Sequence, residues 1–138
     1  MTLDADVVRT RCQEIDQSLT RLRHIAAIPR TAFVTDADAR DIACYRLLIA
    51  IEAALALCYH VSARRLRVAP EDYAGCFVAL ERAGLIEAEL SERLQRMARF
   101  RNLLVHVYWT IDYGRIHELL QGDIDDLAVF SRTVAALL

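Results

Sequence analysis

The stretch from Ile42 to Val61, IACYRLLIAIEAALALCYHV, decides how the rest of this 138-residue sequence is interpreted. It is apolar almost throughout, and its length alone would allow it to cross a membrane. Arg46 and Glu52 argue against a membrane span, because each would cost roughly 2.5 kcal/mol or more inside the hydrocarbon. A helix that is apolar on nearly all sides is typical of the centre of a helical bundle, or of a helix that a dimer interface buries further. We therefore expect no membrane segment and a bundle built around this helix.

Amphipathic segments lie on both sides of the central helix, and each has start and stop signals of its own. Pro29 ends the first segment, and acidic residues at Asp36 and Asp38 suit the positive end of the helix dipole where the central helix begins. The expected helices run from about Leu3 to Ile28, from near Asp36 to Val61, from Tyr73 to Ala83, from about Glu87 through Tyr108, and from Asp112 to Leu138. Gly84 is the stop signal of the short third helix, and Asp112 is the N-cap of the last one. Gly122 is the point where the last helix could bend.

The composition agrees with this pattern. Hydrophobic residues make up 55% of the chain, against four Gly and two Pro, which excludes a disordered protein and favours long helices with short connections over a sheet. We expect an all-α protein, an antiparallel four-helix bundle with one additional short helix, forming a single domain over residues 1–138.

Charge and cysteine content narrow the function classes. The formal net charge is −2, so any site for a polyanion must be local. All 17 basic residues are Arg, which excludes lysine nucleophiles, Schiff bases and P-loop chemistry. The four Cys are widely spaced with no C-x-x-C pair, so we expect buried, reduced thiols and no metal site. The acidic start MTLDAD is unlike a signal peptide, which indicates a cytoplasmic protein.

The fourth helix carries two residues that do not fit an apolar core. Arg101 and Tyr108 occupy its apolar stripe, seven residues apart. A guanidinium cannot be neutralised, so a carboxylate, a phosphate or water must meet its donors. Glu52, isolated in the central helix, is the candidate structural partner. The residues alone leave open whether Arg101 pairs with Glu52 or faces a ligand.

His106 and Asn102 add to the chemistry of this segment. They are four residues apart, so their side chains are neighbours on the helix surface. Arginine can hold a phosphate through two parallel hydrogen bonds and stabilise transition-state charge, while histidine can take or give a proton. The combination suits phosphodiester chemistry. Taken singly, each residue has a plain structural explanation as well: an ion pair for Arg101, a surface or cap position for His106, and a core or rim position for Tyr108.

The segment MARFRNLLVHVYWTID resembles the signature of the HEPN superfamily, and specifically of the HepT-type toxins of HEPN/MNT toxin–antitoxin systems, whose pattern is R-x-x-x-x-H-x-Y. The similarity extends from about Asp36 onward, through the Glu-Ala-Ala core of the central helix and the Asp-Asp-Leu before Phe130. The position between the motif His and Tyr, often polar or acidic in such sequences, is Val107 here.

The resemblance implies a metal-independent endoribonuclease toxin of a type VII system that needs no cofactor. Such toxins form homodimers in which the two motifs meet in a composite cleft. It implies that His106 is the general acid/base, Arg101 the clamp on the scissile phosphate and Asn102 a helper. It also implies an MNT-type nucleotidyltransferase antitoxin that transfers AMP to Tyr108.

Two further features bear on an RNA substrate. Arg96 and Arg99, with Arg93, form a basic run before the histidine, and Arg64, Arg65 and Arg67 form a second cluster. We consider Glu52, Arg96 and Arg99 as supporting or RNA-binding residues, although such runs are usually a solvated helix face. Two other classes stay open: a catalytically silent HEPN module for dimerisation or nucleotide binding, in which Arg101 is tied to Glu52 within one chain, and a purely structural helical protein.

Overall fold

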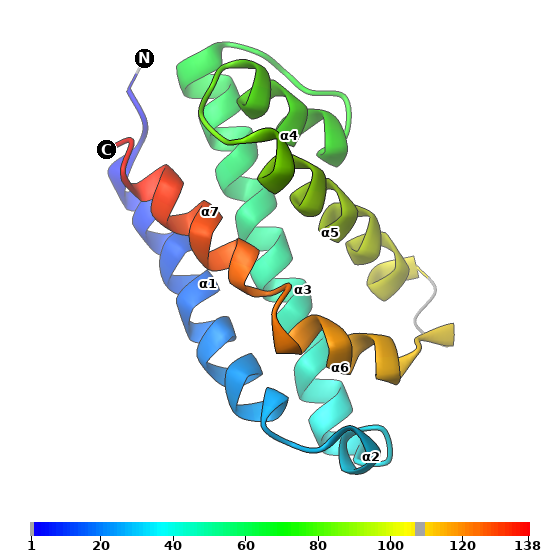
Figure 1. Ribbon diagram of the computed structural model, residues 1–138. Coiled ribbons are helices and arrows are strands. Elements are labelled where there is room, and N and C mark those ends of the chain that lie inside the picture. The colour runs from blue at the N-terminus through cyan, green and yellow to red at the C-terminus, as the bar shows by residue number, and fades with distance from the viewer. Residues whose placement is uncertain (1, 107–109) are drawn as a thin grey trace.

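The computed structural model describes residues 2–106 and 110–138, and every regular element in that part of the chain is helical. The helices are α1 (Ala5–Ala26), α2 (Arg30–Phe33), α3 (Ala37–Val61), its π-helical continuation η1 (Ser62–Leu66), α4 (Tyr73–Arg82), α5 (Ala88–His106), α6 (Tyr113–Gln121) and α7 (Asp125–Ala135). The all-α prediction is confirmed. Figure 1 shows α3 between the neighbouring helices, with both chain termini at the same end of the bundle.

Aspartate side chains define where four of the helices begin. Each accepts a hydrogen bond from a backbone N–H of the first turn, which otherwise has no partner within the helix. These N-caps are Asp4 for α1, Asp36 for α3, Asp72 for α4 and Asp112 for α6. The predicted starts of α3 and of the helix after Asp112 are therefore confirmed.

Gly84 ends α4, as its sequence position predicts. Its φ of +76° lies in the left-handed region, which glycine adopts at little cost. The N–H of Gly84 donates to the carbonyl of Glu81 at 2.9 Å, and that of Leu85 donates to the carbonyl of Leu80 at 3.0 Å. These two bonds form a complete Schellman motif and satisfy the last carbonyls of α4.

The C-terminal region differs from the expected single helix. Gly122, Asp123 and Ile124 separate α6 from α7. Glycine favours a break at this point because it loses more backbone entropy in a helix than any other residue. The break lets α6 pack against α1 and α2 while α7 packs against α1, α3 and α5. The single-turn α2, which buries Phe33 completely, was not predicted from the sequence.

The core is one cluster with α3 at its centre. Phe77 of α4 and Phe130 of α7 meet edge to face, with ring centroids 5.4 Å apart and both rings buried. Ala37–Leu66 is long and apolar enough to cross a membrane, a test that core helices of soluble proteins also pass. Half of its most apolar window is buried inside the protein, and α3 contacts α1, α4, α5 and α7.

His60 ties the start of the chain to the end of α3. The backbone N–H of Asp4 donates to Nε2 of His60 at 2.9 Å. Burial lowers the pKa of His60, the nearby Arg64 lowers it further, and Asp4 opposes both. A lowered pKa keeps the imidazole neutral, which is the form that can accept this hydrogen bond.

Candidate active site

Arg101 lies on the face of α5 that packs against α3 and α4. Its Nε donates a hydrogen bond to Oε1 of Glu52, and its Nη1 donates to Oδ1 of Asn102 at 3.2 Å. The guanidinium carbon lies 5.1 Å from the centre of the Tyr73 ring, close enough for a cation–π contact. Glu52 therefore meets the requirement for a polar partner opposite Arg101.

Among the described residues, this arrangement engages only part of the guanidinium. The Arg101 side chain is 17% exposed and that of Glu52 is 40% exposed, so the pair lies at the rim of the core. In the described part of the chain, Nη2 of Arg101 has no hydrogen-bond partner. Glu52 engages one of the five donors of the guanidinium, and Asn102 engages another.

His106 is the last residue of α5 and is exposed, as is Asn102 one turn earlier. His106 follows Arg101 by five positions, which corresponds to about 140° around the helix axis and about 7.5 Å along it. No hydrogen bond or ion pair joins the two within residues 2–106 and 110–138. The chain thus brings Arg101, Asn102 and Glu52 together and presents His106 on a different face.

The other predicted residues do not share one environment. Tyr108 lies outside the described residues. Arg96 is exposed and pairs with Glu92 one turn away at 3.1 Å. Arg99 is exposed and has no ion-pair partner in the described part of the chain. Arg93 is held in an ion pair, because its Nε donates to both carboxylate oxygens of Asp126 at 3.1 Å. This pair links α5 to α7.

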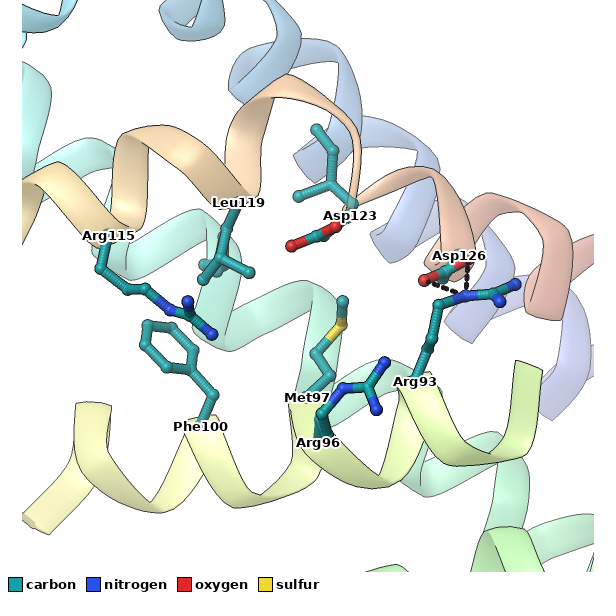
Figure 2. A pocket seen from close by; sticks show the side chains of 10 residues that line it. Arg93, Arg96, Met97, Phe100, Arg115, Leu119, Asp123 and Asp126 are labelled. Atoms are coloured by element: carbon teal, nitrogen blue, oxygen red, sulfur yellow. Dashed lines mark hydrogen bonds and ion pairs between the residues drawn. The ribbon is translucent and has the colours of Figure 1, made fainter. Parts of the chain in front are cut away.

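Two hollows border α5 where it faces residues of α6 and of the segments beside α6. The first is a cavity of about 80 Å³ between α5 and the α6–α7 region, with Arg93, Arg96 and Arg115 around it (Figure 2). The second is a groove of about 580 Å³. Its lining includes Arg96, Arg99, Phe100, Leu103, Ile111 and Arg115. Sequence reasoning missed Arg115, because no local pattern links α6 to this face of α5.

The cysteines are free thiols. Cys58 and Cys76 are buried, whereas Cys12 and Cys44 are half-buried, so the expectation of four buried thiols was wrong for two of them. Burial raises the pKa of Cys44 to about 11 and also raises the pKa of Cys58. Thiols with a raised pKa carry little thiolate and are poor nucleophiles. In the residues described, no group of three His, Cys, Asp or Glu side chains is placed to hold a metal ion.

A helical bundle that carries an arginine held on a carboxylate, and a histidine five residues later, has the fold and the motif of the HEPN superfamily. Within it, the chain belongs to the Ribonuclease HepT-like family, which matches residues 15–134. The recognition made from the segment MARFRNLLVHVYWTID is confirmed.

Individual relatives cover nearly the whole chain. An mRNA nuclease HepT from Shewanella oneidensis is 21% identical over 131 residues, which are 95% of this chain and 98% of the relative. A solved structure of a tri-AMPylated Shewanella oneidensis HEPN toxin in complex with an MNT antitoxin is 21% identical, with a TM-score of 0.87 over 95% of this chain and 98% of that one. YutE, a cytosolic protein of unknown function from Bacillus subtilis, is 15% identical, with a TM-score of 0.82 over 99% of this chain and 92% of that one.

Proposed function

We propose that this protein is the ribonuclease toxin of a type VII HEPN/MNT toxin–antitoxin pair, a cytoplasmic, single-domain endoribonuclease that cleaves RNA without a metal ion. The observation that carries the proposal is the R-x-x-x-x-H-x-Y motif within a Ribonuclease HepT-like match over residues 15–134. Ribonuclease activity has support from the relative named mRNA nuclease HepT, and the cytoplasmic location from the cytosolic YutE.

The chemistry assigns a step to each site residue. A neutral imidazole of His106 takes the proton of the ribose 2′-hydroxyl, and the 2′-oxygen attacks the phosphorus. The bond to the 5′-oxygen breaks, and a protonated imidazole supplies the proton of that leaving group. Arg101 holds the phosphate with the N–H groups that Glu52 and Asn102 leave unused, and it stabilises the charge of the pentacoordinate transition state. Glu52 and Asn102 are positioning residues that orient Arg101.

The need for both a base and an acid favours a homodimer. One motif supplies one imidazole, and two of the other histidines are engaged elsewhere: His60 accepts from Asp4, and His117 bonds to the carbonyl of Ile28. Two subunits supply two copies of His106. The angular separation of Arg101 and His106 on α5 also suits a cleft in which groups from both subunits meet.

The product of this mechanism provides its first test. Because the 2′-oxygen is the nucleophile, cleavage by the purified, unmodified protein in EDTA is expected to leave a 2′,3′-cyclic phosphate on one fragment and a 5′-hydroxyl on the other. Mass spectrometry of a cleaved oligoribonucleotide measures both ends. An oligonucleotide with 2′-methoxy groups serves as the control, since it has no nucleophile. A 5′-phosphate end, or activity only with added metal, would contradict the mechanism.

A catalytically silent HEPN module is the second candidate, and the Arg101–Glu52 pair within one chain favours it. In that case the ion pair with Glu52 would hold Arg101 permanently, and the chain would serve dimerisation or nucleotide binding. A stable dimer without RNA cleavage in the same assay would establish this reading. The third reading, a purely structural helical protein, conflicts with membership of a ribonuclease-like family over 120 residues (15 to 134).

We assign Tyr108 as the site where an MNT-type nucleotidyltransferase antitoxin attaches AMP. A solved complex of an AMPylated HEPN toxin with an MNT antitoxin supports this partner, because the toxin in that complex has the fold of this chain. The transfer joins the tyrosine oxygen to the α-phosphorus of ATP and releases pyrophosphate. A phosphate two residues from His106 would repel RNA and obstruct its approach.

After co-expression with the nucleotidyltransferase gene, the intact mass of the protein is expected to rise by one or more AMP units. The modified protein should no longer cleave RNA. The Tyr108→Phe variant should carry at least one AMP unit fewer and should still cleave RNA. Tyr45→Phe, an exposed tyrosine on α3, is the matched control and should still be modified. A mass shift that is complete in Tyr108→Phe would remove this role.

A further inference from the structure

One face of α5 leads from the groove to His106. Arg96, Arg99, Leu103 and His106 follow one another at steps of three, four and three, which is the spacing of a single stripe on a helix. The first three line the 580 Å³ groove, and His106 is on the next turn. A ligand lying along this stripe would therefore reach the proposed general acid/base.

The charges in the groove favour an anion. Arg96, Arg99 and Arg115 line it from α5 and α6. Arg99 and Arg115 have no ion-pair partner in the described residues, and Arg96 shares its charge with Glu92. Asp112 is the carboxylate in the lining, and its Oδ1 already accepts hydrogen bonds from the backbone N–H groups of Gly114 and Arg115.

The groove also offers apolar surface to a planar ring. Leu103 is 52% exposed, which is high for a leucine, and Phe100 and Ile111 line the groove beside it. Figure 2 shows the Arg115 side chain extending toward the Phe100 ring from the opposite helix. Aromatic and guanidinium planes are the surfaces on which nucleobases stack.

The groove and the neighbouring cavity differ in volume. A volume of about 580 Å³ lies within the range of roughly 300–1,000 Å³ typical of ligand pockets. The neighbouring cavity of about 80 Å³ has room for only two or three waters, at about 30 Å³ each. The groove, and not the cavity, can accept a nucleotide.

We propose that this groove binds the single-stranded RNA next to the scissile bond, with phosphates on Arg99 and Arg115 and a base against Phe100 and Leu103. The inference rests on the proposed ribonuclease function. RNA is favoured over an acidic protein segment because guanidinium groups, the aromatic ring of Phe100 and the exposed Leu103 line one groove, beside the stripe that ends at His106.

The test measures binding apart from cleavage. The probe is a short, fluorescein-labelled oligoribonucleotide whose 2′-hydroxyls are all methylated, so that it binds without being cut. Fluorescence anisotropy at several salt concentrations gives the affinity and its salt dependence. The proteins are the wild type, Arg99→Ala, Arg115→Ala, the double variant, and Arg21→Ala as the matched control. Arg21 is exposed on α1, which does not line the groove.

Each groove substitution is expected to weaken binding about five- to tenfold. The double variant should also reduce the slope of log affinity against log salt by roughly 1.4, since each phosphate contact on single-stranded nucleic acid contributes about 0.7. Arg21→Ala should match the wild type. Leu103→Asp should weaken binding further by placing a negative charge beside the bases, whereas Leu103→Met should not. Thermal unfolding midpoints should stay unchanged throughout.

The outcomes distinguish this inference from the proposed function. If RNA is cleaved in a His106-dependent way but the double variant keeps wild-type affinity and salt slope, the groove proposal is overturned and the ribonuclease stands. If the groove binds the probe through Arg99 and Arg115 but no RNA is cut, the ribonuclease fails and the groove stands. If the wild type does not bind the probe, or if the double variant alters only dimer mass or antitoxin binding, the groove is not an RNA site.

Discussion

Replacing His106 by alanine is expected to lower the rate of RNA cleavage by about 10²- to 10⁴-fold, because general acid–base catalysis contributes about that factor. The protein should fold normally, since His106 is exposed at the end of α5. Replacing an exposed side chain away from the core usually changes stability by no more than about 0.5 kcal/mol. Single-turnover cleavage of a labelled oligoribonucleotide, together with the thermal midpoint, separates the chemical effect from stability.

The control for this variant is His24→Ala. His24 is also an exposed histidine in the last turn of a long helix, and it lies on α1. Its replacement should leave cleavage unchanged. Affinity for the methylated probe should be similar in His106→Ala and the wild type, because His106 acts on protons more than on binding. Full activity in His106→Ala, or an equal loss in His24→Ala, would be incompatible with His106 as the acid/base.

Replacing Phe130 by alanine is expected to lower the free energy of unfolding by about 3–5 kcal/mol, the usual cost of removing a buried aromatic ring. The ring has no exposed surface and packs edge to face on Phe77, so its loss would leave a void between α4 and α7. Chains of this size unfold with a total of about 5–15 kcal/mol, and the thermal midpoint should fall by about 10–20 °C.

Val129→Ala is the matched control for Phe130→Ala. Val129 is the preceding residue of α7, and its side chain faces solvent. Its replacement should change the free energy of unfolding by no more than about 0.5 kcal/mol. Urea unfolding followed by circular dichroism measures both variants. A small effect in Phe130→Ala would show that Phe130 does not occupy the core as described.

The helical elements were predictable because their signals are local. Asp36 and Asp112 were recognised as helix starts and Gly84 as a stop, since a cap needs only neighbouring backbone groups. The break at Gly122 was underestimated, and α2 was missed. Both depend on packing. α6 and α7 share α1 as a partner, but α6 also packs against α2 and α7 against α5, and α2 buries Phe33.

The candidate site was predictable in part for the same reason. The motif residues Arg101, Asn102 and His106 lie on one helix, so their identity and spacing are local. The pairing of Arg101 with Glu52 crosses 49 positions, and the sequence could name the candidate without deciding the outcome. The ion pair between Arg93 and Asp126 engages one arginine of the basic run, and no local sequence pattern predicts this pair.

By itself, the sequence determined the all-helical class, the ends of most helices, the HEPN family and the motif, because periodicity, capping and residue spacing act over a few neighbouring positions. Only the tertiary structure decided which charges stay available. The packing of α3 and α7 against α5 brings Glu52 to Arg101 and Asp126 to Arg93, and the fold places Arg115 of α6 in the same groove lining as Arg99. Charge pairing depends on distances between side chains remote in sequence, and the fold alone sets those distances.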